Sequence, residues 1–90
     1  MATVCKHVRY SGHVQGVGFR YTAQALAAHR PVAGYVRNLP DGDVELVAEG
    51  EAGAVDEFLA TVSARMGEYI TETTVRDEAP AGHRGFHVRH

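Results

Sequence analysis

The sequence predicts one α+β domain over residues 1–90, in which two helices cover one face of a mainly antiparallel sheet. Two stretches carry apolar residues at helical spacing, and the segments around them alternate between apolar and polar residues, as half-buried strands do. Proline and glycine mark the boundaries between these segments. A chain of 90 residues can bury a single hydrophobic core, so we expect one domain.

The first strand is predicted over residues 4–10, where Val4, Val8 and Tyr10 share one parity. The first helix is predicted over residues 21–30, an alanine-rich stretch that ends because Pro31 cannot continue it. Its apolar residues can share one face, and these are Tyr21, Ala25, Leu26 and Ala28.

A hairpin follows, with strands over residues 33–38 and 43–49. The connection Leu39-Pro40-Asp41-Gly42 has strong turn chemistry, because proline presets its own φ and glycine accepts a positive one. These two strands should therefore pair antiparallel.

The second helix is predicted over residues 52–66, with Gly67 as its stop. Its apolar residues recur at i, i+3, i+4, i+7 and i+11, which indicates a face packed on the core: Val55, Phe58, Leu59, Val62 and Met66. A fourth strand is expected within residues 71–77. A short fifth strand over residues 85–89 should turn Phe86 and Val88 inward. The order β-α-β-β-α-β is that of a ferredoxin-like split βαβ sandwich, with the last strand extending or leaving the pattern.

Composition and charge argue against several classes of function for this chain. The formal net charge of −2 and the pI near 6.3 argue against nucleic-acid binding, which usually needs a basic face. No stretch is long and apolar enough for a membrane span, and no leader-like segment follows Met1, so we expect a cytoplasmic protein. Cys5 has no second cysteine and is interpreted as a reduced strand residue.

The most informative segment is the glycine-rich run from Gly12 to Arg20. Glycines let successive backbone N–H groups point at one spot, and a following helix start adds unsatisfied donors. This pattern predicts a site for a phosphate or carboxylate with a fixed positive charge, Arg20, at its exit. The run lacks the Lys-Ser/Thr pair of a nucleotide-binding P-loop, and Tyr21 stands where a dinucleotide motif has its third glycine. It also lacks the aromatic stacking residues of an RNA platform.

Two motifs resemble the signatures of the acylphosphatase family. The first is Gly12-x-Val14-Gln15-Gly16-Val17-x-Phe19-Arg20. The second is Gly34-Tyr35-Val36-Arg37-Asn38, followed by Gly42-x-Val44 and Gly50, and the aromatic-x-apolar-Arg ending of residues 86–89 is similar too. The resemblance covers essentially the whole chain. One departure is Tyr10, where the family usually has an aliphatic residue.

This resemblance implies hydrolysis of an acyl phosphate to a carboxylate and inorganic phosphate, without a cofactor or metal. Backbone N–H groups from about Gln15 to Phe19 (Gln15, Gly16, Val17, Gly18, Phe19) would surround the phosphoryl oxygens, and the planar fork of Arg20 would grip two of them. Asn38 would place the attacking water in line. We expect the ends of the first two strands to lie side by side at one end of the sheet, which would bring the loop and Asn38 together. The expected partner is a small-molecule acyl phosphate, and the protein that the resemblance implies is a small monomer.

Other readings stay open on the residues alone. A noncatalytic anion-binding domain on the same fold is the main alternative, because fold alone does not determine function. An acidic stretch is interpreted as turn and strand surface rather than a cation site, and it comprises Asp41, Asp43 and Glu45. The histidines lack metal-ligand spacing, with His7 alone on a strand face and His83, His87 and His90 in the tail. Strand parity turns Arg37 away from Asn38, so it is expected on the surface.

Overall fold

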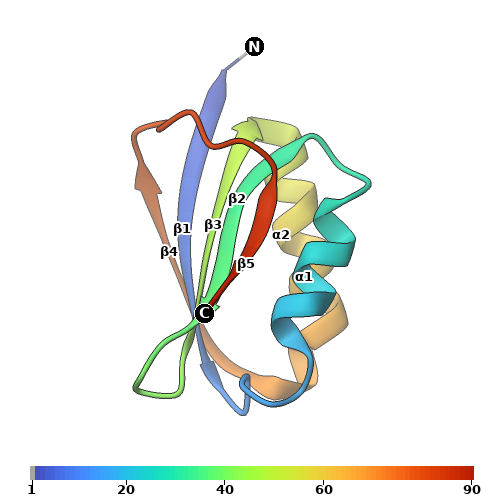
Figure 1. Cartoon of the computed structure of the whole chain (residues 1–90), viewed down its shortest axis with the longest axis vertical. Helices are drawn as coiled ribbons and strands as arrows, with labels where there is room; N and C mark the ends of the chain where they lie inside the picture. The colour runs from blue at the N-terminus through green and yellow to red at the C-terminus, as the bar shows by residue number, and fades with distance from the viewer. Residues whose placement is uncertain (1) are drawn as a thin grey trace.

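The computed structural model describes residues 2–90 as a five-stranded sheet with two α-helices on one face (Figure 1). The predicted α+β class and ferredoxin-like order are confirmed. The strands lie in the order β4-β1-β3-β2-β5. Their bounds are β1 Thr3–Gly12, β2 Val32–Asn38, β3 Val44–Glu51, β4 Ile70–Glu78 and β5 Phe86–Arg89. The helices are α1 Phe19–Ala27 and α2 Ala52–Met66, and a 3₁₀ turn, η1 Gly67–Tyr69, leads from α2 into β4.

The sheet is antiparallel except at one edge. β3 lies in the middle and pairs antiparallel with both β1 and β2. β5 pairs parallel with β2, so the short last strand extends the sheet. The ends of β1 and β2 were expected to lie side by side, and this is wrong because β3 lies between them. β1 and β2 nevertheless run in the same direction and finish at the same end of the sheet, since Tyr10 and Asn38 each pair with Val44 of β3.

The hydrophobic core lies between the sheet and the two helices. Period-2 alternation in the strands and 3.6-residue spacing in α2 put apolar side chains on the facing surfaces. Residues of the sheet with 1% or less of their surface exposed include Val8, Tyr10, Val36, Val44, Leu46 and Ala48. The helices contribute Phe19, Ala23, Val55, Phe58 and Val62, each at 2% or less. Burying a side chain such as Phe58 stabilises the fold by roughly 1.5–3 kcal/mol.

α1 departs from its predicted position. It begins two residues earlier, at Phe19, because Gly18 takes a left-handed conformation and serves as the N-cap. It ends at Ala27, three residues earlier, and a turn through Arg30 leads to Pro31. The face on the core is Phe19, Ala23 and Ala27, and of the predicted apolar face only Leu26 packs against the core, so that prediction was wrong for the other three residues. Tyr21, Ala25 and Ala28 share the outer face and are exposed.

The edge strand β4 is exposed along nearly its whole length. It is held by its ladder with β1, by an ion pair between Lys6 and Asp77, and by the Thr71 hydroxyl, which donates to the carbonyl of Ser11 at 3.2 Å. Within residues 2–90, neither helix is long and apolar enough to cross a membrane.

Candidate functional site

The loop between β1 and α1 has the geometry of an anion-binding turn. Gly16 and Gly18 both have φ near 78°, in the left-handed region. Residues other than glycine adopt this conformation at a cost of roughly 1–2 kcal/mol. The loop leads directly into the N-terminus of α1 at the lower end of the molecule in Figure 1. The first backbone N–H groups of a helix have no partner within it, so this loop and helix start together offer donors to one anion.

Apolar side chains hold both ends of this loop in the core. Val14 is fully buried, and Phe19 is 2% exposed. The ring of Phe19 lies 4.9 Å from that of Tyr10, centroid to centroid, in a tilted arrangement. Tyr10 is also fully buried, and burial raises the pKa of its phenol well above the ordinary value. The aromatic residue that departs from the family pattern is therefore a packing partner of the loop.

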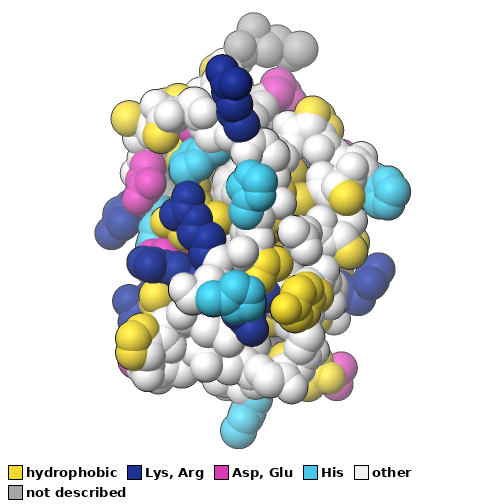
Figure 2. All heavy atoms as spheres, viewed as in Figure 1, with side chains coloured by type: hydrophobic (Ala, Val, Ile, Leu, Met, Phe, Trp, Pro, Cys, Tyr) yellow, Lys and Arg dark blue, Asp and Glu magenta, His cyan; other side chains and the backbone are white. Residues whose placement is uncertain are grey.

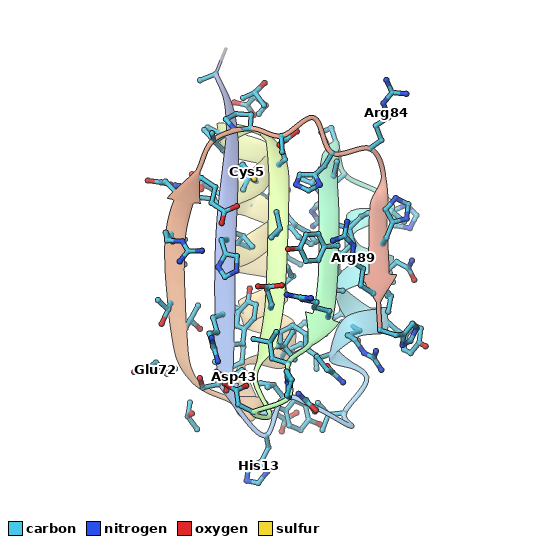
Figure 3. The ribbon with its side chains drawn as sticks, turned by 60° about the vertical axis from the view of Figure 1, so that its left-hand side comes forward. Cys5, His13, Asp43, Glu72, Arg84 and Arg89 are labelled. Atoms are coloured by element: carbon cyan, nitrogen blue, oxygen red, sulfur yellow. The ribbon has the colours of Figure 1, made fainter. Side chains whose placement is uncertain are left out.

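The Gln15 side chain ties the loop to the turn between β2 and β3. Its Nε2 donates to the carbonyl oxygens of Leu39, at 2.7 Å, and Asp43, at 2.9 Å. Arg9 stabilises the same β2–β3 turn. Its Nε donates to the Asp43 carboxylate at 2.7 Å, and its guanidinium also forms an ion pair with Asp41. The hydrogen bond from Arg9 holds the Asp43 pKa below its usual value. In Figure 3 Asp43 lies at this lower end of the sheet.

Arg20 and Asn38 line the same pocket, although 18 positions separate them in the sequence. The pocket has a volume of about 170 Å³. Of the loop residues predicted for the site, Gly16, Gly18 and Phe19 line the pocket, whereas Gln15 and Val17 do not. Two lining residues were missed, Val14 and Tyr21. The glycine run contained the first, and no sequence signal pointed to the second.

The guanidinium of Arg20 has a neutral surrounding. Its Nη1 donates to Nδ1 of His90 at 3.0 Å, and its Cζ lies 5.9 Å from the centre of the Tyr21 ring. Arg20 takes part in no ion pair with a carboxylate among residues 2–90. Its positive charge is therefore available to an anion in the pocket.

The open face of the sheet, opposite the helices, carries a charged network that corrects the prediction for Glu45. Glu45 was expected on the surface and is buried, 9% exposed, because His7 and Arg37 cover it. Nε2 of His7 lies 2.7 Å from one carboxylate oxygen, and Nε of Arg37 donates to the other at 2.5 Å. Burial alone would raise the Glu45 pKa, but these hydrogen bonds outweigh it and the pKa lies below its usual value. Arg37 is exposed and turned away from Asn38, as expected. Figure 2 shows Lys and Arg side chains gathered over this face, on the left of the view.

A second polar cluster lies at the opposite end of the sheet, where Figure 3 labels Cys5. Ligand atoms of Cys5, Glu49 and His83 lie within 4.8 Å of one another, so these three residues could hold a metal ion. The Glu49 oxygens also accept the backbone N–H groups of Ala81, at 2.6 Å, and His83, at 3.0 Å, which ties the β4–β5 connection to the sheet. Burial and the Glu49 carboxylate raise the pKa of the Cys5 thiol. Cys5, Glu49 and His83 are far apart in the sequence, so no local spacing of ligand residues could have predicted this cluster.

The fold and the pocket define a class of protein. It is a small ferredoxin-like α+β protein with a small pocket lined by a glycine loop, a helix start, an arginine and an asparagine. Comparisons with known proteins then identify the family within this class.

A family model described as Acylphosphatase matches residues 6–88. The acylphosphatase of Rubrobacter xylanophilus is 49% identical over 84 residues, which cover 91% of this chain and 76% of that protein. The acylphosphatase of Methanothrix thermoacetophila is 40% identical over 87 residues, 96% of this chain and 97% of that protein. The crystal structure of acylphosphatase from Bacillus subtilis matches with a TM-score of 0.87 at 33% identity, covering 97% of this chain and 99% of that one. The chain belongs to the acylphosphatase family and is a hydrolase that acts on acyl phosphates.

Proposed function

We propose that this chain hydrolyses acyl phosphates in the pocket shared by Arg20 and Asn38, with the phosphoryl group held by the loop. Support comes from one observation above all, the convergence of a cationic side chain, an amide side chain and a positive-φ glycine turn on one small cavity. Backbone N–H groups from Gln15 to Phe19 would surround the phosphoryl oxygens. The Arg20 fork would donate two parallel hydrogen bonds to a pair of them.

Asn38 places the attacking water in this proposal. It is the last residue of β2, and its strand parity puts it on the helix side of the sheet, where the pocket lies. The water oxygen forms a bond to phosphorus while the bond from phosphorus to the acyl oxygen breaks. The carboxylate leaves with the electron pair of that bond, and a phosphate oxygen accepts the proton of the water.

The positive charge that the reaction needs would come from Arg20 and the amides. A carboxylate is a good leaving group, and phosphoryl transfer through a loose transition state depends mainly on positioning and charge stabilisation. We therefore propose that no metal or other cofactor takes part and that no side chain acts as a general base. The partner is a small-molecule acyl phosphate, and the net charge of −2 supports an enzyme that acts without nucleic acid.

Release of inorganic phosphate from benzoyl phosphate, with and without a chelator, tests this proposal. We expect turnover that the chelator leaves unchanged. Arg20→Lys should lose turnover by a factor of roughly 100 or more, because an ammonium group cannot reproduce the two-point grip. Asn38→Ala should lose turnover while inorganic phosphate still inhibits the residual activity.

Arg65→Ala is the matched control, since Arg65 is an exposed arginine in the last turn of α2. It should retain full activity. Phosphate binding without any turnover in the unaltered chain would overturn the proposal in favour of a noncatalytic anion-binding domain. Near-normal turnover of Arg20→Lys would contradict the assigned role of Arg20.

A further inference from the structure

We call the pocket shared by Arg20 and Asn38 the phosphate pocket, and a second, larger cavity lies next to it. It has a volume of about 610 Å³ and lies between the outer face of α1 and the start of β5, two elements that contact each other and run side by side in Figure 1. We call it the α1 groove. Its lining residues include Tyr21, Gln24, Ala25, Ala28, Arg30 and Phe86. Tyr21 lines both cavities, so the α1 groove and the phosphate pocket are neighbours that share this residue as a wall.

The α1 groove runs away from the reacting end of the molecule. β2 and β5 are parallel, and the groove residues Val32 and Phe86 stand at or near the starts of these strands, whereas Asn38 ends β2. Nη1 of Arg30 donates to the carbonyl of Leu26 at 3.0 Å, which places its guanidinium beside that turn of the chain. Five residues of helix separate Tyr21 from Leu26, about 7.5 Å. This is the reach of a medium-chain acyl group.

The two ends of the α1 groove differ in chemistry. Near the phosphate pocket it offers the Tyr21 ring, which is 59% exposed, and the small side chain of Ala25 follows about one helical turn further along α1. At the other end, Arg30 is the single charged residue among those lining the groove. Its hydrogen bonds go to the Leu26 carbonyl and the Thr61 hydroxyl, both neutral acceptors.

The charge of Arg30 is uncompensated. Within residues 2–90 it makes no ion pair with a carboxylate, and its buried Nε has no hydrogen-bond partner. No acidic residue lines the groove. An apolar chain that ends in an anionic group would therefore match the groove along its length.

We infer that the α1 groove binds the acyl part of the substrate and favours a medium-chain acyl group with a carboxylate at its far end. The methylene groups would lie along Tyr21 and Ala25, and the carboxylate near Arg30. This inference rests on the proposed function, because the phosphoryl group must occupy the adjoining pocket. Hydrolysis would release inorganic phosphate and a dicarboxylate by the bond changes described above.

Three substrates separate the contributions of chain and charge. Acetyl phosphate is too short to enter the α1 groove. Octanoyl phosphate fills it with an uncharged chain, and the monophosphate of suberic acid has the same chain length with a terminal carboxylate. We expect kcat/KM to rise from acetyl to octanoyl phosphate by about tenfold or more, because several methylene groups are buried. A further gain of roughly fivefold is expected for suberoyl phosphate, from one partly exposed charge pair.

Two variants assign these gains to residues. Ala25→Trp would fill the α1 groove and should remove most of the gain for both long substrates while acetyl phosphate turnover stays unchanged. Ala64→Trp, on the exposed face of α2, is its matched control and should leave all three substrates unaffected. Arg30→Gln should abolish the preference for suberoyl over octanoyl phosphate, and Arg30→Lys should keep it. This preference is a ratio, so it does not depend on how much of a variant is folded.

The inference is overturned if the unaltered chain treats suberoyl and octanoyl phosphate alike, or if Ala25→Trp lowers acetyl phosphate turnover as much as that of the long substrates. Failure to hydrolyse any of the three compounds would instead reject the proposed function on which the inference rests.

Discussion

Arg20 and His90 are in contact although 70 positions separate them in the sequence, with Nη1 of Arg20 3.0 Å from Nδ1 of His90. A guanidinium is only a donor, so this contact requires Nδ1 of His90 to be the acceptor. The contact links the start of α1 to the residue after β5. It holds the cationic side chain of the phosphate pocket by a neutral group, which leaves the charge of Arg20 available.

Removing this acceptor tests whether His90 positions Arg20. We expect His90→Ala to lower kcat/KM for benzoyl phosphate by about fivefold to tenfold, the equivalent of one modest hydrogen bond. His90→Gln should restore part of the loss, because its amide oxygen can accept. His87→Ala is the control, since His87 is an exposed histidine on β5, three residues before His90. Equal activity of His90→Ala and the unaltered chain would show that Arg20 needs no such support.

Substitution of Gln15 tests the tie between the loop and the β2–β3 turn. Gln15→Ala leaves the carbonyl groups of Leu39 and Asp43 without this donor, so we expect a weaker Kd for inorganic phosphate and a lower Tm. Gln15→Glu should be worse than Gln15→Ala, because a carboxylate only accepts and would face two carbonyl oxygens. Isothermal titration and thermal unfolding measure the two effects. A Gln15→Glu variant that matches the unaltered chain would exclude this role.

The left-handed glycines of the loop can be tested against a matched position elsewhere. Gly16 has φ 78° and Gly82 has φ 74°, and a Cβ added at either would meet nothing within 4 Å. Alanine at each position should therefore cost a similar roughly 1–2 kcal/mol in the free energy of unfolding. Only Gly16→Ala should weaken phosphate binding, because Gly82 lies in the β4–β5 connection. Urea unfolding and phosphate titration of both variants check this, and equal phosphate affinities would contradict it.

Glu45 should make the stability of the fold depend on pH. Its pKa is lower in the folded chain than its ordinary 4.5, so the ionised carboxylate stabilises the fold above that pH. This stabilisation is lost as the pH falls from about 4.5 through the folded value. We expect Glu45→Gln to lower the free energy of unfolding at neutral pH by roughly 1–3 kcal/mol, since His7 and Arg37 lose a charged partner.

The Glu45→Gln variant should also lose less stability than the unaltered chain on acidification to about pH 3. Urea unfolding at several pH values measures both quantities. Glu57→Gln serves as the control, because Glu57 is an exposed glutamate on α2. Parallel curves of stability against pH for Glu45→Gln and the unaltered chain would rule out the network as the cause.

The predictions from the sequence succeeded where a local pattern carries the information. α2 occupies the predicted residues 52–66, because its apolar spacing acts within one segment. Gly67 was expected to stop it, but its φ of −57° is helical and the chain continues into η1. α1 was placed with the wrong inner face, since alanine has no strong preference and many faces of an alanine-rich helix look alike. The burial of Glu45 could not be predicted either, because its partners come from β1 and β2.

By itself, the sequence determined the order of the elements, the family and the two motifs with Arg20 and Asn38, because identity and spacing of residues are properties of the chain. Tertiary structure decided which of these residues share a cavity. The insertion of β3 between β1 and β2 sets the distance between loop and asparagine, and the pairing of β5 beside β2 brings His90 to Arg20. The same pairing forms the α1 groove, whose walls lie more than fifty positions apart. Contacts at that separation depend on strand pairing, which no local pattern records.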